Sequence, residues 1–278
     1  MPELKYYYRN TVPPIAYIRT LGKKRPGVIF CNEFMCTLKS EKSELLEKYA
    51  TDRGHSYIRF DYTDHGDSYF KKKTANEPID EKNVLSPFPG PKPLKNEEKW
   101  LSFKQWKADV ENTMDEFSEG PQVLIGDGFG AWLALLVALE RPEKVKGVLC
   151  LSTGVDMMAR YMNCMFDDGE KERLQAGEVI WVQDHPQGPY VGARKMVDES
   201  RDFELLTREG KLPIRCPVRF VHCMEDTLIP YGWVKRLSNK LQSQDVEVYL
   251  KKSGDHRMTT EKDMELVYKA LDSILTLF

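Results

Sequence analysis

Three short segments hold residues whose types and order are typical of nucleophilic catalysis. The first is "GDGFG", residues 126–130, where an apolar, strand-like run turns into an apolar helix. Such a turn commonly presents a nucleophile at its middle position, which here is Gly128, a residue without a reacting side chain. The segments "HCMEDTLIP" and "GDHRMTT" contain Asp226 and His256. The order nucleophile, acid, base is therefore present with its first member missing.

Asp226 and His256 each follow an apolar run with the pattern of a β-strand. A carboxylate beside an imidazole holds the ring in one tautomer and raises its basicity. We therefore expect a His–Asp dyad that acts as a general base on water, or on a C–H or O–H group of a substrate.

Predicted strands and helices, which must position these residues, alternate along the chain. Strands are predicted at 4–8, 15–18, 27–30, 56–60, 122–125, 147–151, 218–222 and 246–250. Helices are predicted at 40–53, 99–116, 129–140, 231–242 and 260–277. The first two strands could form a hairpin, and the later alternation indicates βαβ units with a mostly parallel sheet. Ligands of such sheets bind beyond the carboxyl ends of the strands.

Two stretches interrupt the alternation within what we interpret as one domain, residues 1–278. Residues 71–98 are rich in Pro, Lys and Glu, which predicts a surface insertion with little to bury. Residues 154–215 contain many methionines and aromatic residues but no clear strand. We expect this second stretch to form a short helical lid over the site.

Composition excludes several classes of partner. The net charge is −2, and 30% of the 278 residues are charged with both signs mixed, so neither nucleic acid nor an anionic membrane is expected as a partner. No apolar run approaches the roughly 20 residues that span a bilayer. The six cysteines lack metal-site spacing, and "GDGFG" is no dinucleotide fingerprint, so neither a metal nor a cofactor is expected.

The cysteines and the start of the chain bear on the compartment. Cys31 and Cys150 lie in apolar runs, which is typical of buried, reduced thiols. The first ten residues have no signal core and no transit-peptide character. We expect an intracellular protein, either cytoplasmic or mitochondrial in a processed form.

The remaining histidines receive structural interpretations. His55 and His65 flank a predicted strand and are expected at the surface or in loops. His222 is expected to pack and to form a hydrogen bond at a strand end. His185 belongs to the expected lid.

Longer motifs carry a resemblance to a known family. The segments are "PGVIF", "GHSYIRFDYTDHGDS", the glycine turn followed by "RPEKV", "CPVRFVHCMEDTLIP" and "GDHRM". From about residue 26 onward the chain resembles the α/β-hydrolases, most of all the branch of mitochondrial palmitoyl-protein thioesterases and acyl-glucuronide deacylases. The resemblance implies a lid-covered, cofactor-independent hydrolase of acyl esters and thioesters. It also implies that Asp226 and His256 are the triad acid and base.

The chain departs from that family around the reacting position. The nucleophile position is Gly128, Cys223 replaces a family glycine, and Glu33 stands in the loop that normally helps to form the oxyanion hole. A carboxylate pointing inward there would oppose the charge that an oxyanion hole stabilises. The expected substrate-binding or oxyanion region comprises Asn32, Glu33, Phe34, Asp127 and Phe129.

These departures leave three interpretations open. The first is an enzyme in which His256 and Asp226 act on a small, largely apolar substrate by elimination, isomerisation, cyclisation or water-mediated acyl hydrolysis. The second is a non-catalytic pseudo-hydrolase that binds a small apolar ligand. The third is a serine esterase or thioesterase inactivated by an engineered serine-to-glycine change. In the first interpretation Asp127 and Glu33 could each add a carboxylate for acid–base work. Direct attack by Asp127 is disfavoured, because the residue before an elbow nucleophile points elsewhere, which favours a structural or helix-capping role for it.

Overall fold

A mixed β-sheet of eight strands forms the centre of the protein. The computed structural model describes residues 3–9, 12–69, 101–182 and 190–278. The strands of the sheet are β1 (Leu4–Tyr7), β2 (Ile15–Thr20), β3 (Lys24–Cys31), β4 (His55–Phe60), β5 (Gln122–Asp127), β6 (Val145–Leu151), β9 (Val218–Cys223) and β10 (Val246–Lys251). All eight coincide with strands expected from the apolar patterning, within a few residues at their ends.

The order of the strands in the sheet is β1-β2-β4-β3-β5-β6-β9-β10. The pairs β1–β2 and β2–β4 are antiparallel, and every pair from β4 to β10 is parallel. The expected N-terminal hairpin pairing and the mostly parallel sheet are therefore confirmed. The central strands β3, β5 and β6 are buried on both faces, which explains why they are nearly continuous apolar runs.

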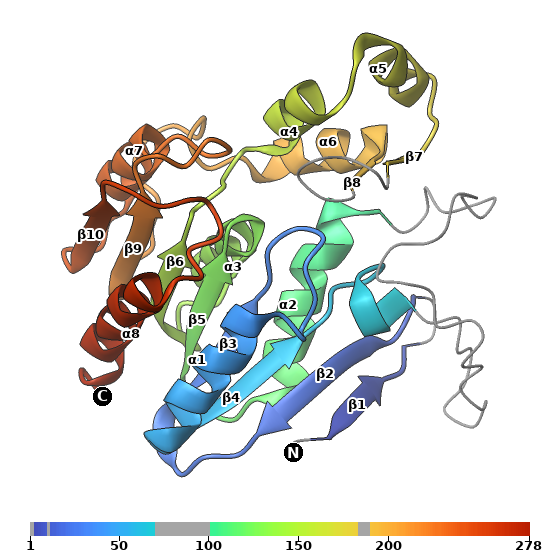
Figure 1. Cartoon of the computed structure of the whole chain (residues 1–278). Coiled ribbons are helices and arrows are strands. Elements are labelled where there is room, and N and C mark those ends of the chain that lie inside the picture. Colours follow the sequence, from blue (N-terminus) through green and yellow to red (C-terminus); the bar gives the residue numbers. More distant parts are fainter. Residues whose placement is uncertain (1–2, 10–11, 70–100, 183–189) are drawn as a thin grey trace.

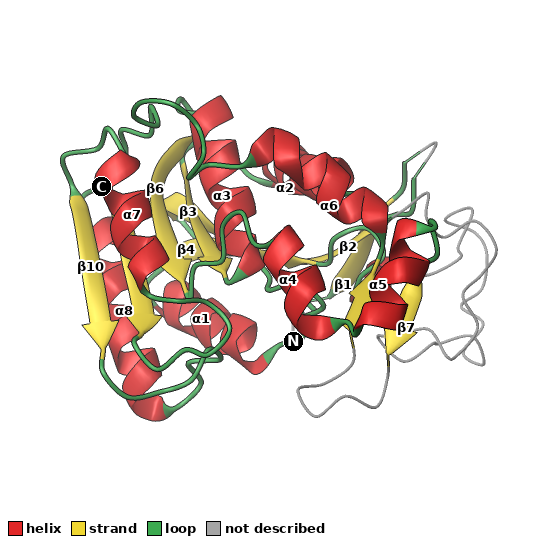
Figure 2. Ribbon diagram, turned by 90° about the horizontal axis from the view of Figure 1, so that it is seen from above, coloured by secondary structure: helices red, strands yellow, loops and turns green. Residues whose placement is uncertain are grey.

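Helices cover both faces of the sheet, as Figures 1 and 2 show. The helices of this layer are α1 (Glu41–Asp52), α2 (Phe103–Phe117), α3 (Phe129–Glu140), α7 (Gly232–Lys240) and α8 (Glu261–Leu275). Side chains of α1 and α8 join one hydrophobic cluster, and those of α2, α3 and α7 join the cluster on the opposite face. No helix among the described residues is long and apolar enough to cross a membrane.

Residues 154–182 and 190–215 form a group of short elements beside the carboxyl ends of the strands (Figure 1), and several of their side chains join the main hydrophobic cluster. They are α4 (Met158–Met165), α5 (Asp168–Gln175), β7 (Ile180–Val182), β8 (Tyr190–Gly192), α6 (Arg194–Ser200) and the 3-10 helix η4 (Arg201–Phe203). The antiparallel pair β7–β8 was not expected, because each strand has only three residues and shows no alternating pattern. The expected insertion at 71–98 lies outside the described residues; the 3-10 helix η1 (Gly66–Tyr69) precedes it.

Close packing of α3 against the sheet explains two glycines of the turn between β5 and α3. A Cβ atom at position 126 would lie 2.3 Å from the Cα atom of Ala131, and one at position 130 would lie 2.1 Å from the carbonyl oxygen of Cys31. Any side chain at either position would push the helix away from β3 and β5. The first and last glycines of "GDGFG" are thus required by packing.

Two histidines that were expected at the surface or in loops are buried, and each ring forms a local hydrogen bond. The ring of His55 is buried with Nδ1 2.7 Å from the carbonyl oxygen of Pro26. His65 is also buried, with Nδ1 3.1 Å from the carbonyl oxygen of Thr63, and burial lowers its pKa to about 4. The expectation of a surface or loop position is therefore wrong for His55, which begins β4, whereas His65 lies in a loop as expected but is buried there.

Candidate active site

The loops that follow β3, β5, β9 and β10 meet at the carboxyl edge of the sheet. Glu33 follows β3, Gly128 follows β5, Asp226 follows β9 and His256 follows β10. Carboxyl ends of parallel strands share one edge, so the sheet alone brings these four positions together. Glu33 and His256 are 223 positions apart in the sequence, yet their side chains are in contact.

The side chains of His256 and Asp226, which the sequence predicts to form a dyad, are in contact. Nδ1 of His256 lies 2.7 Å from Oδ2 of Asp226. The other oxygen of Asp226 accepts hydrogen bonds from the backbone N–H groups of Leu228 and Ile229, at 2.8 and 2.9 Å. These bonds fix the carboxylate, and the carboxylate in turn fixes the imidazole ring.

Two further residues support the dyad and were not identified as functional from the sequence. The hydroxyl of Ser152, at the end of β6, donates to the backbone carbonyl of His256 at 2.6 Å. His222 is fully buried, with Nε2 2.9 Å from the carbonyl oxygen of Ile229 and 3.5 Å from Asp226 Oδ2. A serine at a strand end and a histidine within a strand carry no motif, so no sequence signal marks either role.

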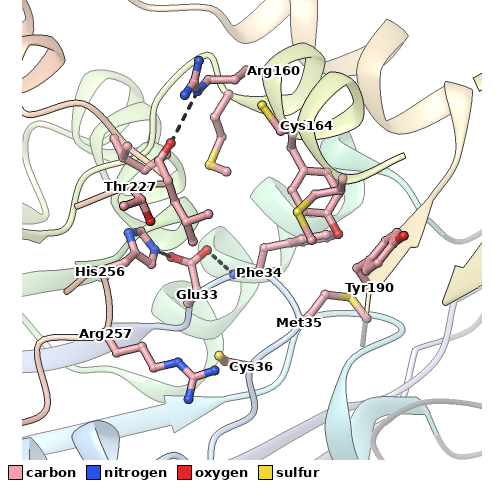
Figure 3. A pocket seen from close by; sticks show the side chains of 15 residues that line it. Glu33, Phe34, Met35, Cys36, Arg160, Cys164, Tyr190, Thr227, His256 and Arg257 are labelled. Carbon is pink, nitrogen blue, oxygen red and sulfur yellow. Dashed lines mark hydrogen bonds and ion pairs between the residues drawn. The ribbon is translucent and has the colours of Figure 1, made fainter. Parts of the chain in front are cut away.

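Glu33 points into the site toward His256 (Figure 3), which therefore lies between the carboxylates of Asp226 and Glu33. Its Oε2 atom lies 3.1 Å from Nε2 of His256. Its Oε1 atom accepts hydrogen bonds from the backbone N–H groups of Phe34, at 2.7 Å, and Phe129, at 3.0 Å. These two N–H groups follow β3 and the glycine elbow, which are the positions that supply an oxyanion hole in this kind of site. A carboxylate oxygen of the chain itself therefore occupies the hole.

The other two residues expected in the oxyanion region, Asn32 and Asp127, form side-chain contacts away from the carboxylate of Glu33. Asn32 is buried, and its side-chain amide donates to the carbonyl oxygen of Phe60 at 2.6 Å. Asp127 forms a partly buried ion pair with Lys42, whose Nζ atom lies 2.7 and 2.8 Å from its two carboxylate oxygens. No side chain caps α3, so Asp127 is held by Lys42 and not by the helix. Among these residues, only Glu33 and Phe34 line the pocket described below.

Electrostatics of the site keep His256 protonated. Burial lowers the pKa of His256, but hydrogen bonds and charge from Asp226 and Glu33 outweigh it and raise the pKa to about 10. Burial raises the pKa of Asp226, yet its bond to His256 brings that pKa below the usual value. At neutral pH the resting site thus holds an imidazolium between two carboxylates. An imidazolium donates protons and cannot accept one.

The free energy of unfolding is expected to depend on pH because of this ion pair. A histidine whose pKa rises from 6.5 to about 10 on folding contributes stability in full below pH 6.5, and this contribution disappears as pH rises to about 10. The loss is on the order of a few kcal/mol, since one pKa unit corresponds to about 1.4 kcal/mol. We expect Glu33→Gln to flatten this fall in the free energy of unfolding, measured by urea denaturation at several pH values.

The control for this measurement is Glu225→Gln, which removes an equal charge from an exposed glutamate beside Asp226. Other titrating groups are common to both variants, so the difference between their pH profiles isolates Glu33. Identical profiles for the two variants would show that Glu33 does not hold the proton on His256.

A pocket opens over Glu33 and His256, between the sheet edge and the 154–215 segment. Its volume is about 240 Å³, which is below the roughly 300–1,000 Å³ of pockets for drug-sized ligands. The residues that line it are Glu33, Phe34, Met35, Cys36, Met157, Arg160, Tyr161, Cys164, Met165, Tyr190, Thr227, Leu228, Ile229, His256 and Arg257. The walls are mostly apolar, and the charged groups are the Glu33–His256 pair and two arginines.

Metal ligation has no support among the described residues. No group of three or more His, Cys, Asp or Glu side chains there is arranged to hold a metal ion. All six cysteines are free, and Cys31 and Cys150 are buried as expected.

Comparison with known sequences identifies relatives over nearly the whole chain. "Palmitoyl-protein thioesterase ABHD10, mitochondrial" from Mus musculus is 29% identical over 274 residues, which cover 98% of this chain and 82% of the mouse protein. The protein of the same name from Homo sapiens is 28% identical over 276 residues, covering 98% and 80%. No protein-family model matches the chain.

Solved structures agree with this similarity. Alpha/beta hydrolase domain-containing protein 10 from mouse superposes with a TM-score of 0.76 at 26% identity, covering 99% of this chain and 98% of the mouse chain. A putative hydrolase from Agrobacterium vitis superposes with a TM-score of 0.77 at 19% identity, with the same coverage. The chain therefore has the α/β-hydrolase fold and is homologous to ABHD10.

Proposed function

We propose that this chain is an enzyme that uses His256 and Asp226 to transfer protons on a small, largely apolar substrate, without a serine nucleophile. The observation that carries the proposal is the position of His256. Its Nδ1 atom is fixed 2.7 Å from Asp226, and the residue lines an apolar pocket. A base fixed by a carboxylate at the edge of a cavity is the arrangement that general acid–base catalysis requires. A site that only binds an apolar molecule has no need of it.

The Glu33 carboxylate limits when His256 can act as a base. While Glu33 is charged and in contact with Nε2, the proton stays on the imidazole. His256 becomes a base once a substrate displaces this carboxylate or neutralises it. Elimination, isomerisation, cyclisation and water-mediated acyl hydrolysis are the reaction classes compatible with such a base.

The experiment that tests this function is a screen in which turnover must depend on His256. Short p-nitrophenyl esters, acyl thioesters and small apolar epoxides and ketones are assayed with the protein and with His256→Gln. We expect saturable turnover by the protein and a loss of at least about 100-fold in the variant, the usual contribution of a general base. Thermal unfolding of both proteins checks the fold. Equal turnover by the two proteins would contradict the proposal.

A non-catalytic pseudo-hydrolase is the second candidate function, and the filled oxyanion hole favours it. Glu33 satisfies both N–H donors and also neutralises His256, so the resting site has no reacting group left open. Native mass spectrometry distinguishes the two functions. An apolar compound that copurifies with the protein and stays intact on long incubation would favour binding.

The third candidate, a serine esterase altered at position 128 alone, fits the geometry less well. A Cβ atom at position 128 would lie 1.1 Å from Oε2 of Glu33. A change of one serine to glycine gives no reason for a carboxylate to fill the space of the lost side chain. The glycine and the glutamate fit each other, which supports a site rebuilt at two positions.

The relatives suggest where to look for the protein and its substrate. They are named mitochondrial palmitoyl-protein thioesterases. We extend to this chain an intracellular location, either mitochondrial or cytoplasmic, and a small molecule as its partner. We do not extend their serine chemistry, because Gly128 has no hydroxyl group.

A further inference from the structure

The carboxylate of Glu33 occupies the place of the missing nucleophile. Its Oε2 atom lies 1.1 Å from the point where a Cβ atom at position 128 would stand, so it takes the space of a side chain on the elbow. It also lies 3.1 Å from Nε2 of His256, within hydrogen-bond reach of the base. The elbow has φ 51° and ψ −110° at Gly128, the sharp conformation that presents a nucleophile in this fold. The position of the nucleophile is thus kept, and an oxygen from another loop fills it.

The oxyanion hole of this site faces the same carboxyl group. The N–H groups of Phe34 and Phe129 both donate to Oε1 of Glu33. A substrate carbonyl oxygen therefore finds these donors already used. The negative charge that they can stabilise is charge on Oε1, which develops when a nucleophile adds to the carboxyl carbon of a Glu33 ester.

We propose that Glu33 is the covalent nucleophile of this enzyme and that its substrate is a small apolar molecule with an sp³ carbon bearing an anionic leaving group. The proposal rests on the proposed function, since it assigns the second half of the reaction to His256 and Asp226. Carboxylates are established covalent nucleophiles in enzymes. The order of events follows from the contacts of the two carboxylate oxygens.

In the first step Oε2 of Glu33 bonds to the sp³ carbon. The bond from that carbon to the leaving group breaks, and its electron pair departs with the leaving group as an anion. This step develops no oxyanion on the substrate, so it needs no oxyanion hole. Its product is a neutral alkyl ester of Glu33.

Formation of the ester changes the state of His256. The negative charge of Glu33, which helps to raise the pKa of His256 to about 10, is now absent. The imidazole loses its Nε2 proton to solvent, and it keeps the hydrogen bond from Nδ1 to Asp226. His256 is converted from an acid to a base by the first step itself.

In the second step His256 takes a proton from a water molecule as its oxygen bonds to the carboxyl carbon of Glu33. The charge moves to Oε1, where the N–H groups of Phe34 and Phe129 hold it. The bond from the carboxyl carbon to Oε2 then breaks, and His256 protonates the departing alcohol. The sum is alkyl halide or alkyl sulfate plus water, giving alcohol, a proton and the leaving anion.

The pocket fits this class of substrate. Met35, Met157 and Tyr161 are among its apolar lining residues, and Met side chains adapt to alkyl chains of varied shape. Arg160 and Arg257 also line the pocket and are exposed, so they bring positive charge to its mouth. A departing anion is favoured by these two guanidinium groups.

The test follows the oxygen atom in a single turnover. Protein in excess is mixed with primary alkyl bromides, from ethyl to octyl, in water labelled with ¹⁸O, and the alcohol and the peptide that contains Glu33 are analysed by mass spectrometry. The proposal expects an unlabelled alcohol from the first turnover and one ¹⁸O atom in Glu33. His256→Gln is expected to accumulate an alkyl ester on Glu33, and Glu33→Gln is expected to consume no bromide. Glu225→Gln, an exposed glutamate outside the pocket, serves as the matched control and should behave as the unaltered protein.

The possible outcomes separate this proposal from the proposed function. Label in the first alcohol and none in Glu33 overturns covalent catalysis and leaves His256 as the base of a direct attack by water. If no bromide is consumed and no ester forms in His256→Gln, then Glu33 is not the nucleophile and the substrate class is wrong. The ester and thioester screen then still tests the role of His256. Turnover that persists unchanged in His256→Gln, with no ester accumulating on Glu33, overturns both.

Discussion

Replacing Gly128 by serine and Glu33 by alanine together is expected to create a serine esterase, whereas neither change alone does so. The double variant would have a hydroxyl on the elbow, the dyad of His256 and Asp226 at 2.7 Å, and two free N–H donors from Phe34 and Phe129. Those are the parts of a serine triad with its oxyanion hole.

Each single variant lacks one of these parts for a reason of space or chemistry. In Gly128→Ser the new Cβ atom would lie 1.1 Å from Oε2 of Glu33, so the carboxylate must shift, but its negative charge stays in the site and competes for His256 and the two N–H donors. In Glu33→Ala the hole and the base are open, but no side chain on the elbow can attack. The two positions should therefore show strong non-additivity, as expected for groups that act as a unit.

The measurement is hydrolysis of p-nitrophenyl acetate together with labelling by a fluorophosphonate. We expect hydrolysis by the double variant on the order of 10³-fold or more above either single variant, since a triad serine contributes far more than this elsewhere. Circular dichroism controls for the strain of a serine at φ 51°. Equal labelling of Gly128→Ser and the double variant would contradict the expected non-additivity, since it would mean that the displaced Glu33 carboxylate blocks neither the oxyanion hole nor His256.

Asp226→Asn is expected to reduce turnover on the order of 10³- to 10⁴-fold while the fold is kept. The amide oxygen can still accept from the N–H groups of Leu228 and Ile229. The amide NH₂ group then faces Nδ1 of His256, which must become an acceptor and move its proton to Nε2. Nε2 can no longer take a proton from water or substrate.

The control for Asp226→Asn is Asp202→Asn, which changes an exposed carboxylate paired with Lys104 on the surface. kcat is measured on whichever substrate the screen identifies, with thermal unfolding of each variant beside it. A loss of less than tenfold in Asp226→Asn would show that the reaction does not depend on the tautomer of His256.

Much of the fold was predictable because each central strand is a local apolar run between turn residues. Strand β5 and helix α3 meet at a glycine turn that the sequence displays directly, and their burial follows from continuous apolar residues. The short strands β7 and β8 were not predictable, because three residues carry no period. The same limit applies to His55 and His65, whose burial depends on carbonyl partners that only the folded chain supplies.

The candidate site was predictable where order along the chain determines position. Asp226 and His256 follow the last two parallel strands, and the sheet then brings them together. The position of Glu33 was not predictable in the same way, because it depends on a side-chain rotamer and on the path of one loop. The sequence presents Gly128 as a loss, while the structure shows it as the space that the Glu33 carboxylate fills.

The filled oxyanion hole also determines which chemical probes can label this protein in a cell extract. Reagents used to profile serine hydrolases across a proteome need a reactive hydroxyl and an unoccupied oxyanion hole. Here the Glu33 carboxylate of the chain itself occupies that hole. Such reagents are therefore expected to leave this protein unlabelled whether or not it is active. Electrophiles that esterify carboxylates would label it, and the labelled peptide would contain Glu33, in the loop after β3.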